Sequence, residues 1–327
     1  MPKIRILSQA AIALMISMEE AISLMRDAFT ALSSDRVDVP VRINMPLSEH
    51  AGRALFMPAY APDYGQIGLK AVTVHPNNPA RNLPFIHGLV LVSDANTGAP
   101  LAVMDGEFIT ALRTGAGSGL ATDLLARADA CVVAVFGAGV QARTQLEAVC
   151  AVRKITDVLI FGRSIVNAKS FAQEASAQHS ASISVAGNPE ALLEADIICT
   201  ATTSLTPVFD PRHVKPGCHI NGVGSYRPDM TEIPANTVAA AKVVVDQRTA
   251  CLSEAGDILV PLEAGLIDEM HIYAELGEIA SGRKAGRTSK SEVTFFKSVG
   301  NAVQDLVVAS HLTRVANEQQ LGNEVEL

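Results

Sequence analysis

The sequence predicts an α/β protein in which a doubly wound parallel sheet is joined to a smaller α+β domain. Its 327 residues are 48% apolar, enough for about two domains that each bury a core. After Arg113, short apolar runs alternate with helix-compatible segments, as in successive β-α-β units. A glycine-rich turn follows the apolar run 131–136 and precedes a helical segment, as in the first unit of such sheets. The three observations together place the parallel sheet in the second part of the chain.

The first part of the chain is expected to form the smaller domain. Ser17 and Glu20 have the spacing of a capping box, which opens a helix with one apolar stripe. Between residues 39 and 103, β-like runs separated by Pro, Asn and Gly clusters predict an antiparallel or mixed sheet. A helix expected over 301–316 near the end of the chain would return to pack against this sheet.

Six short apolar strands are expected in the second part, with helices such as 114–126 and 165–178 beside them. The strands are expected at 130–136, 157–161, 182–185, 196–200, 219–223 and 242–245. Six short parallel strands are what a Rossmann sheet needs. We therefore assign 114–294 to a Rossmann dinucleotide-binding domain, and 1–113 with 295–327 to a smaller domain that binds substrate and dimerises.

Composition and charge exclude several classes of function. The net charge of −8, without any run of Lys and Arg, argues against binding to nucleic acid or to an anionic membrane. Five scattered cysteines without C-x-x-C spacing fit a reduced, cytoplasmic compartment, and no metal site is expected. Residues 4–18 are apolar but lack the cleavage site of a signal peptide, and no apolar stretch reaches the ~20 residues of a membrane span. The expected partner is a small molecule.

The turn that starts at Gly137 reads Gly-x-Gly-x-x-Ala between a strand and a helix, which is the pattern of a dinucleotide-binding turn. Gly137 permits the tight turn, and Gly139 lets a pyrophosphate approach the N–H groups at the start of the helix. We assign this turn to cofactor binding through Gly137, Ala138, Gly139, Val140 and Gln141. An ordinary glycine-rich turn of an α/β sheet is the alternative interpretation.

The residues after the second strand of the parallel sheet favour NADP(H) over NAD(H). Enzymes that bind NAD usually carry Asp or Glu there, which binds the ribose 2′-hydroxyl. This chain has Arg163 and Ser164 instead, and the guanidinium offers a fork of donors to a 2′-phosphate. If Arg163 only begins an exposed helix or stacks on adenine, NAD(H) remains possible.

Two further polar segments follow strands of the expected sheet, and ligands bind outside the carboxyl ends of such strands. We assign both segments to the cofactor site: Thr200, Ala201 and Thr202, then Val223, Gly224 and Ser225. Ser and Thr are also common at strand ends as turn formers and helix caps, which is the structural alternative.

Several motifs occur in a fixed order along nearly the whole chain: 52–58 (GRALFMP), 68–70 (GLK), 109–114 (ITALRT), 220–224 (INGVG) and 296–300 (FKSVG) followed by Asp305. Together they resemble the ornithine cyclodeaminase/mu-crystallin family. The resemblance implies a dimer-forming front domain joined to a Rossmann domain. It also implies the chemistry that the family members share, which is hydride transfer at C2 of an α-amino or α-imino acid. Members include cyclodeaminases, alanine dehydrogenases, imino acid reductases and a lens protein that binds hormone.

The resemblance also implies roles for individual residues. Arg53 and Arg113 would hold the substrate carboxylate, and Lys70 would lie beside the reacting carbon. From the same motifs we assign Thr114 and Ser298 to the cofactor site. A guanidinium matches a carboxylate in bidentate fashion, and a lysine in a partly dry cleft has a lowered pKa that suits proton exchange. Taken singly, each cation would more often be a solvated surface residue.

One position departs from the cyclodeaminases of this family, whose lyase reaction uses an aspartate soon after the strand that carries the 220–224 motif. Tyr226 stands there in this chain, and a phenol with a pKa near ~10 replaces a carboxylate poorly; Asp229 follows three residues later. We therefore expect NAD(P)H-dependent reduction of an α-imino acid, a cyclic ketimine such as 1-pyrroline-2-carboxylate, to the L-amino acid. Alternatives are reductive amination as in alanine dehydrogenase, cyclodeamination of ornithine or lysine, and a mu-crystallin-like binding protein without turnover.

Overall fold

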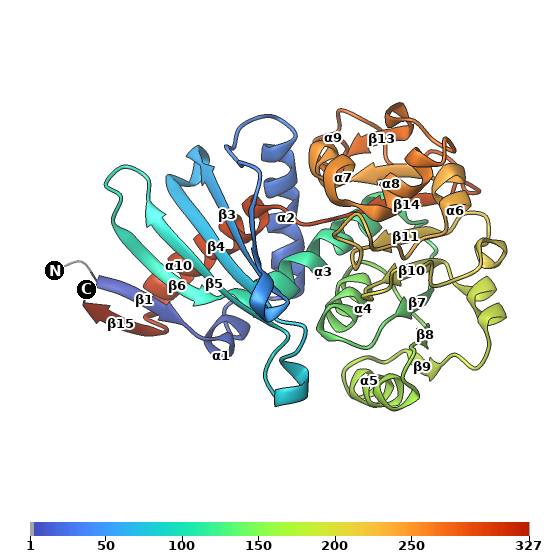
Figure 1. Cartoon of the computed structure of the whole chain (residues 1–327), viewed down its shortest axis with the longest axis horizontal. Coiled ribbons are helices and arrows are strands. Elements are labelled where there is room, and N and C mark those ends of the chain that lie inside the picture. Colours follow the sequence, from blue (N-terminus) through green and yellow to red (C-terminus); the bar gives the residue numbers. More distant parts are fainter. Residues whose placement is uncertain (1–2, 327) are drawn as a thin grey trace. The chain divides into compact units, whose positions relative to one another are not determined.

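The computed structural model describes residues 3–326, and the chain divides into two compact units (Figure 1). Unit 1 consists of the chain up to Arg113 and from Asn301 onward, and unit 2 runs from Thr114 to Gly300. The boundary that the sequence placed at 295 is thus corrected to 301. The physical reason is that strand β14 (Thr294–Lys297) pairs with two strands of unit 2 and completes the sheet of that unit.

Unit 1 is built on a seven-stranded sheet in the order β15-β1-β6-β5-β4-β3-β2 (Figure 1). Its strands are β1 (Lys3–Leu7), β2 (Ile43–Leu47), β3 (Gly52–Ala61), β4 (Gln66–Val74), β5 (Ile86–Asp94), β6 (Pro100–Asp105) and β15 (Asn323–Glu326). β1 and β6 are parallel, whereas the other neighbouring strands are antiparallel. The mixed sheet expected from the first part of the sequence is therefore confirmed.

Two long helices accompany this sheet, α2 (Met18–Leu32) and α10 (Ala302–Gln319). The expected capping box is present, because Ser17 Oγ accepts from the Glu20 N–H and the Glu20 carboxylate accepts from the Ser17 N–H. α10 contacts α2 and strands β3, β4 and β5, so the last long helix does return to the first part of the chain. The shorter elements are α1 (Gln9–Ala13), η1 (Ser48–His50), η2 (Pro62–Tyr64) and η3 (Pro79–Arg81).

Unit 2 contains an eight-stranded parallel sheet in the order β13-β12-β14-β11-β10-β7-β8-β9. Its strands are β7 (Val132–Phe136), β8 (Asp157–Phe161), β9 (Ser182–Val185), β10 (Ile197–Thr200), β11 (His219–Gly222), β12 (Lys242–Val245), β13 (Ile272–Glu275) and β14. The six strands expected from the sequence are confirmed within two residues. β13 was not expected, and β14 lies inside this sheet, between β11 and β12, rather than with unit 1.

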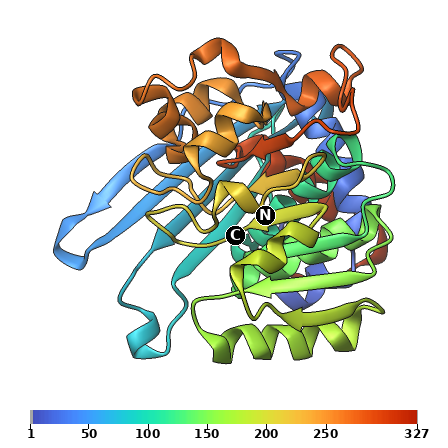
Figure 2. The ribbon, with the colours of Figure 1, turned by 90° about the vertical axis from the view of Figure 1, so that its right-hand side faces the viewer.

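Helices cover both faces of this sheet, which makes it doubly wound. One apolar core joins β7 and β10 to α4 (Val140–Val152) and α5 (Ile165–Gln178), and a second core joins the sheet to α6, α7 and α8. In Figure 2, α5 lies along β9 at the lower edge of the sheet. The remaining elements are α3 (Gly106–Leu125), α6 (Ala235–Ala240), α7 (Arg248–Glu254), α8 (Gly256–Glu263), α9 (Leu276–Ala280), η4 (Pro189–Glu194), η5 (Pro211–His213) and η6 (Glu269–His271). α3 begins at Gly106 rather than at the expected 114.

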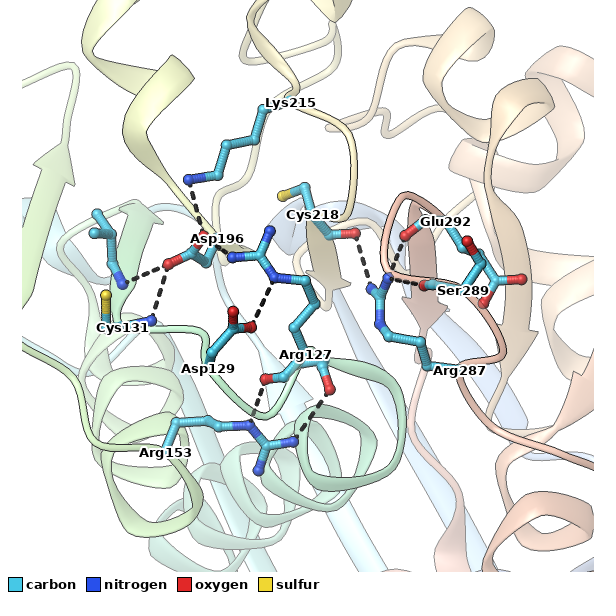
Figure 3. Close-up of polar contacts among 12 residues, drawn as sticks. Arg127, Asp129, Cys131, Arg153, Asp196, Lys215, Cys218, Arg287, Ser289 and Glu292 are labelled. Atoms are coloured by element: carbon cyan, nitrogen blue, oxygen red, sulfur yellow. Dashed lines mark hydrogen bonds and ion pairs between the residues drawn. The ribbon is translucent and has the colours of Figure 1, made fainter.

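The amino ends of the unit 2 strands carry a polar network (Figure 3). Asp196 accepts from the backbone N–H groups of Cys131 (2.9 Å) and Val132 (3.1 Å). It also pairs with Lys215 at 2.8 Å. Although burial raises the pKa of Asp196, the hydrogen bonds from Lys215 and the two N–H groups outweigh burial and lower it. Arg153 donates to carbonyl oxygens at the end of α3, so this end of the sheet is held by internal contacts.

Candidate functional site

The glycine-rich turn of unit 2 has the geometry that a dinucleotide needs. Gly137 has φ +114°, and a Cβ there would lie 2.6 Å from the carbonyl oxygen of Ala201, so only glycine fits. Gly139 is the N-cap of α4, and nothing lies within 4 Å of where its Cβ would be. Because no side chain caps α4, the first N–H groups of this helix remain available to a phosphate.

A cleft of about 680 Å³ opens beside this turn. It brings together seven of the residues that the sequence assigned to the cofactor: Gly137, Ala138, Gly139, Arg163, Ser164, Ala201 and Thr202. Sequence reasoning missed further lining residues: Asn167, Thr203, Ser204, Pro207 and Val208. Asn167 lies in α5, and the other four follow β10 without a motif of their own, so only the polar side chains among them could have drawn attention to this part of the cleft.

Arg163 and Ser164 stand at the rim of this cleft, just after β8. Arg163 is exposed, and no residue among 3–326 forms a hydrogen bond or ion pair with it. Ser164 is the N-cap of α5, where its Oγ accepts from the Asn167 N–H at 3.4 Å. The guanidinium is thus free to bind an anion, whereas the serine hydroxyl already serves the helix.

The other predicted cofactor residues do not line the cleft. Val140 is exposed at the start of α4, and the Thr114 carbonyl accepts from Gln145. The Oε1 atom of Gln141 is buried and has no hydrogen-bond partner in the described part of the chain. Val223 donates its N–H to the Thr200 carbonyl. The three hydroxyls of this group donate to protein acceptors: Thr200 to Glu232, Ser225 to the Met230 carbonyl, and Ser298 to Asp246.

Glu232 ties together the loops that follow β10 and β11, and sequence reasoning did not single it out. Its carboxylate accepts from the N–H groups of Thr202 (2.6 Å) and Gly224 (2.7 Å). A Cβ on Gly224 would lie 2.6 Å from either carboxylate oxygen, which explains the glycine there. Burial, and then the nearby Asp257, raise the pKa of Glu232.

A buried ion pair holds the backbone at Glu232. The Lys297 ammonium lies 2.9 Å from the Asp257 carboxylate, and both side chains are fully buried. The other oxygen of Asp257 accepts from the N–H groups of Glu232 (2.7 Å) and Ile233 (3.0 Å). A lysine in the apolar run of β14 was the sequence signal for this pair, but its acidic partner lies 40 residues away.

In unit 1, the strand alternation of β4 places Lys70 on the buried face of the sheet. Gly68, Val72 and Val74 share this face and are buried, so the Lys70 cation lies among buried uncharged residues of β4. Its Nζ lies 2.8 Å from Asp305 Oδ2 on α10 and 3.4 Å from Thr110 Oγ1. Only 3% of the Lys70 side chain is exposed.

Arg113 joins the same group of side chains. Its Nε donates to Asp305 Oδ1 at 3.2 Å, and its Nη1 donates to Gln304 Oε1 at 3.1 Å. We call Lys70, Arg113, Gln304 and Asp305 the cation cluster. Asp305 thus joins two of the predicted catalytic residues, Lys70 and Arg113, and Gln304 bonds to Arg113. The sequence had assigned no role to Asp305 or Gln304.

The environment of Lys70 lowers its pKa from 10.5 to about 8. Burial is the largest cause, the Asp305 carboxylate opposes it, and the charges of Arg113 and Arg42 add to the lowering. An ammonium with this pKa remains mostly protonated at neutral pH and yet gives up its proton readily. It therefore suits proton transfer to a nitrogen.

Arg53 lies on the same face of the sheet as Lys70. In the β3–β4 pair, Met57 stands opposite Lys70, and Arg53 stands opposite Val74, so the two cations are about 13 Å apart along the strand direction. Arg53 is half-buried, and no residue among 3–326 pairs with it. Its guanidinium is available to an anionic ligand.

The two residues considered for the lyase reaction have other contacts. Tyr226 is half-buried and packs against the apolar core of unit 2. Asp229 is held by Arg227 through two hydrogen bonds, of 2.9 and 2.8 Å, at the surface. Within residues 3–326, no helix is long and apolar enough to cross a membrane, and no group of three His, Cys, Asp or Glu side chains is placed to hold a metal ion.

Known proteins resemble this chain over most of its length. The model of the ornithine cyclodeaminase/mu-crystallin family matches residues 3–320. A Delta(1)-pyrroline-2-carboxylate reductase of Bacillus cereus is 43% identical over 314 residues, covering 95% of this chain and 96% of the relative. The ketimine reductase mu-crystallin of Mus musculus is 38% identical over 270 residues, covering 83% and 82%.

Solved structures match the whole fold. Delta(1)-pyrroline-2-carboxylate reductase of Thermococcus litoralis, in complex with NADH and L-proline, matches with a TM-score of 0.95 at 42% identity, over 98% of this chain and 100% of that chain. An archaeal alanine dehydrogenase dimer with bound NAD matches with a TM-score of 0.93 at 34% identity, over 99% of each chain. The Rossmann-type fold class and the family resemblance are confirmed: this chain belongs to the ornithine cyclodeaminase/mu-crystallin family.

Proposed function

We propose that this protein reduces an α-imino acid to the L-amino acid with NAD(P)H, and that its substrate is a cyclic ketimine such as 1-pyrroline-2-carboxylate. The observation that carries the proposal is the buried ammonium of Lys70, held 2.8 Å from Asp305 in a chain that also has a dinucleotide turn. The names of the Bacillus cereus and Thermococcus litoralis relatives support the same substrate.

In the proposed reaction the C=N bond of the imino acid becomes a CH–NH bond. A bound NAD(P)H supplies the hydride to C2 and becomes NAD(P)⁺, and one proton goes to the nitrogen. Lys70 would donate that proton or share it in a hydrogen bond, which its pKa of about 8 permits. Water would then return a proton to the Lys70 side chain.

The substrate carboxylate would be held by Arg53 and Arg113. Arg113 keeps one guanidinium nitrogen, Nη2, without a partner among residues 3–326, and Arg53 keeps its whole guanidinium. Two guanidinium groups that fix one carboxylate restrict the rotation of C2, and positioning of this kind carries much of the catalysis in imine reduction.

The alternatives differ in what they require of the protein. Reductive amination of a 2-oxo acid with ammonia uses the same cations, and the archaeal alanine dehydrogenase relative supports it as the second candidate. Cyclodeamination is less favoured because Tyr226 stands at the position of the lyase aspartate. A binding protein of mu-crystallin type would not need a proton donor, whereas burial and the neighbouring arginines lower the pKa of Lys70 to about 8, which suits proton transfer.

We propose that NADP(H) is the preferred cofactor and that NAD(H) also serves. The exposed, unpaired guanidinium of Arg163 at the rim of the cleft supports a 2′-phosphate site. The Thermococcus litoralis reductase structure carries NADH, and the archaeal alanine dehydrogenase structure carries NAD. The proposed preference of this chain for NADP(H) therefore rests on Arg163 and neighbouring residues alone.

We further propose a cytoplasmic homodimer in which unit 1 binds substrate and dimerises and unit 2 binds the dinucleotide. The support is a row of apolar residues on the face of the unit 1 sheet opposite Lys70. Ile43, Phe56, Ala71 and Leu89 stand directly opposite one another across β2 to β5. Ile43 is 61% exposed and Leu89 is 56% exposed, so a second copy would bury them.

The experiment that tests the proposed function follows NADPH and NADH oxidation by the purified protein with two substrates in parallel. One sample receives 1-pyrroline-2-carboxylate, and the other receives pyruvate with ammonia. Oxidation with the cyclic imine is the expected result. Oxidation only with the oxo acid would move the assignment to alanine dehydrogenase, and no oxidation in either sample would contradict a reductase.

A further inference from the structure

Asp305 is placed so that one carboxylate serves two cations. It lies in the first turn of α10 and is 1% exposed. Its Oδ2 faces the Lys70 ammonium at 2.8 Å, and its Oδ1 accepts from Arg113 Nε at 3.2 Å. Each oxygen therefore holds a different side chain that the proposed reaction uses.

We propose that Asp305 is a positioning residue for this reaction: it fixes the Lys70 ammonium and the Arg113 guanidinium, so that each presents its remaining N–H donors to the imino acid. This inference rests on the proposed function and extends it to a residue that would itself not touch the substrate. Gln304, the neighbour of Asp305, assists by holding Arg113.

The donors that remain can be counted. The Lys70 ammonium has three N–H groups. It forms an ion pair with Asp305 and donates to Thr110, so one N–H is left without a partner among residues 3–326. Arg113 uses Nε and Nη1, which leaves Nη2 within the described part of the chain. The rotation of both cations is restricted by the same carboxylate, so the directions of the free donors are set together.

The start of α10 fixes the carboxylate and the amide in turn. Gln304 Oε1 accepts from the Asn301 N–H at 2.8 Å as part of a capping box, and the same oxygen accepts from Arg113. The orientation of the Gln304 amide is therefore set by the helix itself. A carboxylate in the first turn of a helix is also favoured by the helix dipole.

Asp305 also controls the charge of Lys70. The groups that act on the Lys70 ammonium are Asp305 from α10, Arg113 from α3 and Arg42 from the segment before β2, together with the hydroxyl of Thr110. Of these, Asp305 raises the pKa of Lys70, whereas burial and the two arginines lower it. Without the carboxylate, we expect Lys70 to be largely neutral at pH 7.5 and unable to donate a proton.

The test is a pH titration of Lys70 by NMR on protein labelled at the lysine ε-carbon, with the Lys70 signal assigned by its loss in Lys70→Met. We compare wild type with Asp305→Asn, and with Glu318→Gln as an exposed control on the same helix. The expected result is that Lys70 of Asp305→Asn titrates at least about one pH unit lower than in wild type, whereas the control is unchanged. An unchanged titration in Asp305→Asn would overturn the inference, whether or not the wild type reduces the imine.

Turnover gives the second readout. The high-pH limb of kcat/KM for 1-pyrroline-2-carboxylate should move to lower pH in Asp305→Asn by the same amount, whereas a merely structural role would lower the rate equally at every pH. If Asp305→Asn does not fold, Asp305→Glu replaces it. The longer side chain keeps the charge, so the limb should stay while kcat falls about 10- to 100-fold through misplacement. An unchanged kcat in Asp305→Glu would contradict positioning.

Discussion

Each unit contains a buried lysine paired with an aspartate, and the two pairs differ in the second partner of the carboxylate. In unit 2, Lys297 and Asp257 lie 2.9 Å apart and are fully buried, and the second Asp257 oxygen accepts from two backbone N–H groups. In unit 1, Lys70 and Asp305 lie 2.8 Å apart, but the second Asp305 oxygen serves Arg113. The two lysine–aspartate distances are therefore nearly equal, but one carboxylate also binds the backbone and the other also binds a second cation.

The difference teaches how to tell a structural pair from a functional one. The Asp257 carboxylate joins one cation to the backbone near Glu232, so the pair holds two loops in place. The Asp305 carboxylate joins two cations and leaves N–H donors of both unused. Lys70, Arg113 and Asp305 together carry one excess positive charge, whereas Lys297 and Asp257 balance each other, so the group around Asp305 is suited to an anionic ligand.

The largest expected effect comes from Lys70→Met. Removing a proton donor of this kind should lower kcat for 1-pyrroline-2-carboxylate by about 10²- to 10⁴-fold. The fold should survive, because Asp305 keeps Arg113 as a partner. Steady-state kinetics and a melting curve of the same sample check both statements. Full activity in Lys70→Met would show that Lys70 does not take part in the reaction.

Lys297→Met should have the opposite profile. It leaves Asp257 and Glu232 buried together without the ammonium that lies beside them, and breaking a buried pair in this way costs about 3–5 kcal/mol. The expected result is a large fall in melting temperature. If any soluble protein remains, its kcat at low temperature should be close to that of wild type. A stable Lys297→Met variant with lost activity would reverse the comparison.

Arg113→Ala should reduce kcat/KM about 10- to 100-fold, because a charge-assisted hydrogen bond to the substrate carboxylate is lost, at ~1.5–3 kcal/mol. In this variant Asp305 would still form its ion pair with Lys70. Arg314→Ala, on the exposed side of α10, is the matched control and should retain wild-type kinetics. Equal kinetics of the two variants would show that Arg113 does not bind the substrate.

Among these variants, Arg163→Ala should have the smallest effect. The variant removes a guanidinium that has no protein partner among residues 3–326, so stability should change little. The KM for NADPH should rise about tenfold through the loss of a phosphate contact, whereas the KM for NADH should stay constant. A wild-type preference for NADH that persists in the variant would contradict the 2′-phosphate site.

How far the sequence could predict these two regions depends on whether the information is local. The turn at Gly137 and six of the unit 2 strands were predictable, because adjacent residues carry the apolar runs and the glycine spacing. β14 was assigned to the wrong unit because its two partner strands lie far from it in the chain, so no adjacent residues show which sheet it joins. Thr200 and Ser225 were assigned to the cofactor as polar residues at strand ends, and Ser298 was assigned from the family motifs. The hydroxyls of all three donate inside the protein, and their contact with the cofactor stays a prediction.

The cation cluster could be predicted only in part. Lys70 and Arg113 emerged from the family resemblance, and the alternation of β4 explains why Lys70 is buried. Asp305 and Gln304 received no role, because the bond between Arg113 and Asp305 joins residues 192 positions apart. A single sequence contains no signal for such a pairing, and the same holds for Glu232 and the loops that it joins.

The most direct test of the central claim is to follow the transferred hydride. The protein is incubated with 1-pyrroline-2-carboxylate and NADPH carrying deuterium at C4 of the nicotinamide, on the face from which hydride is transferred. The amino acid product is then resolved by chiral chromatography and mass spectrometry. The account predicts L-proline with one deuterium at C2. Unlabelled proline, racemic proline or no proline at all would contradict it.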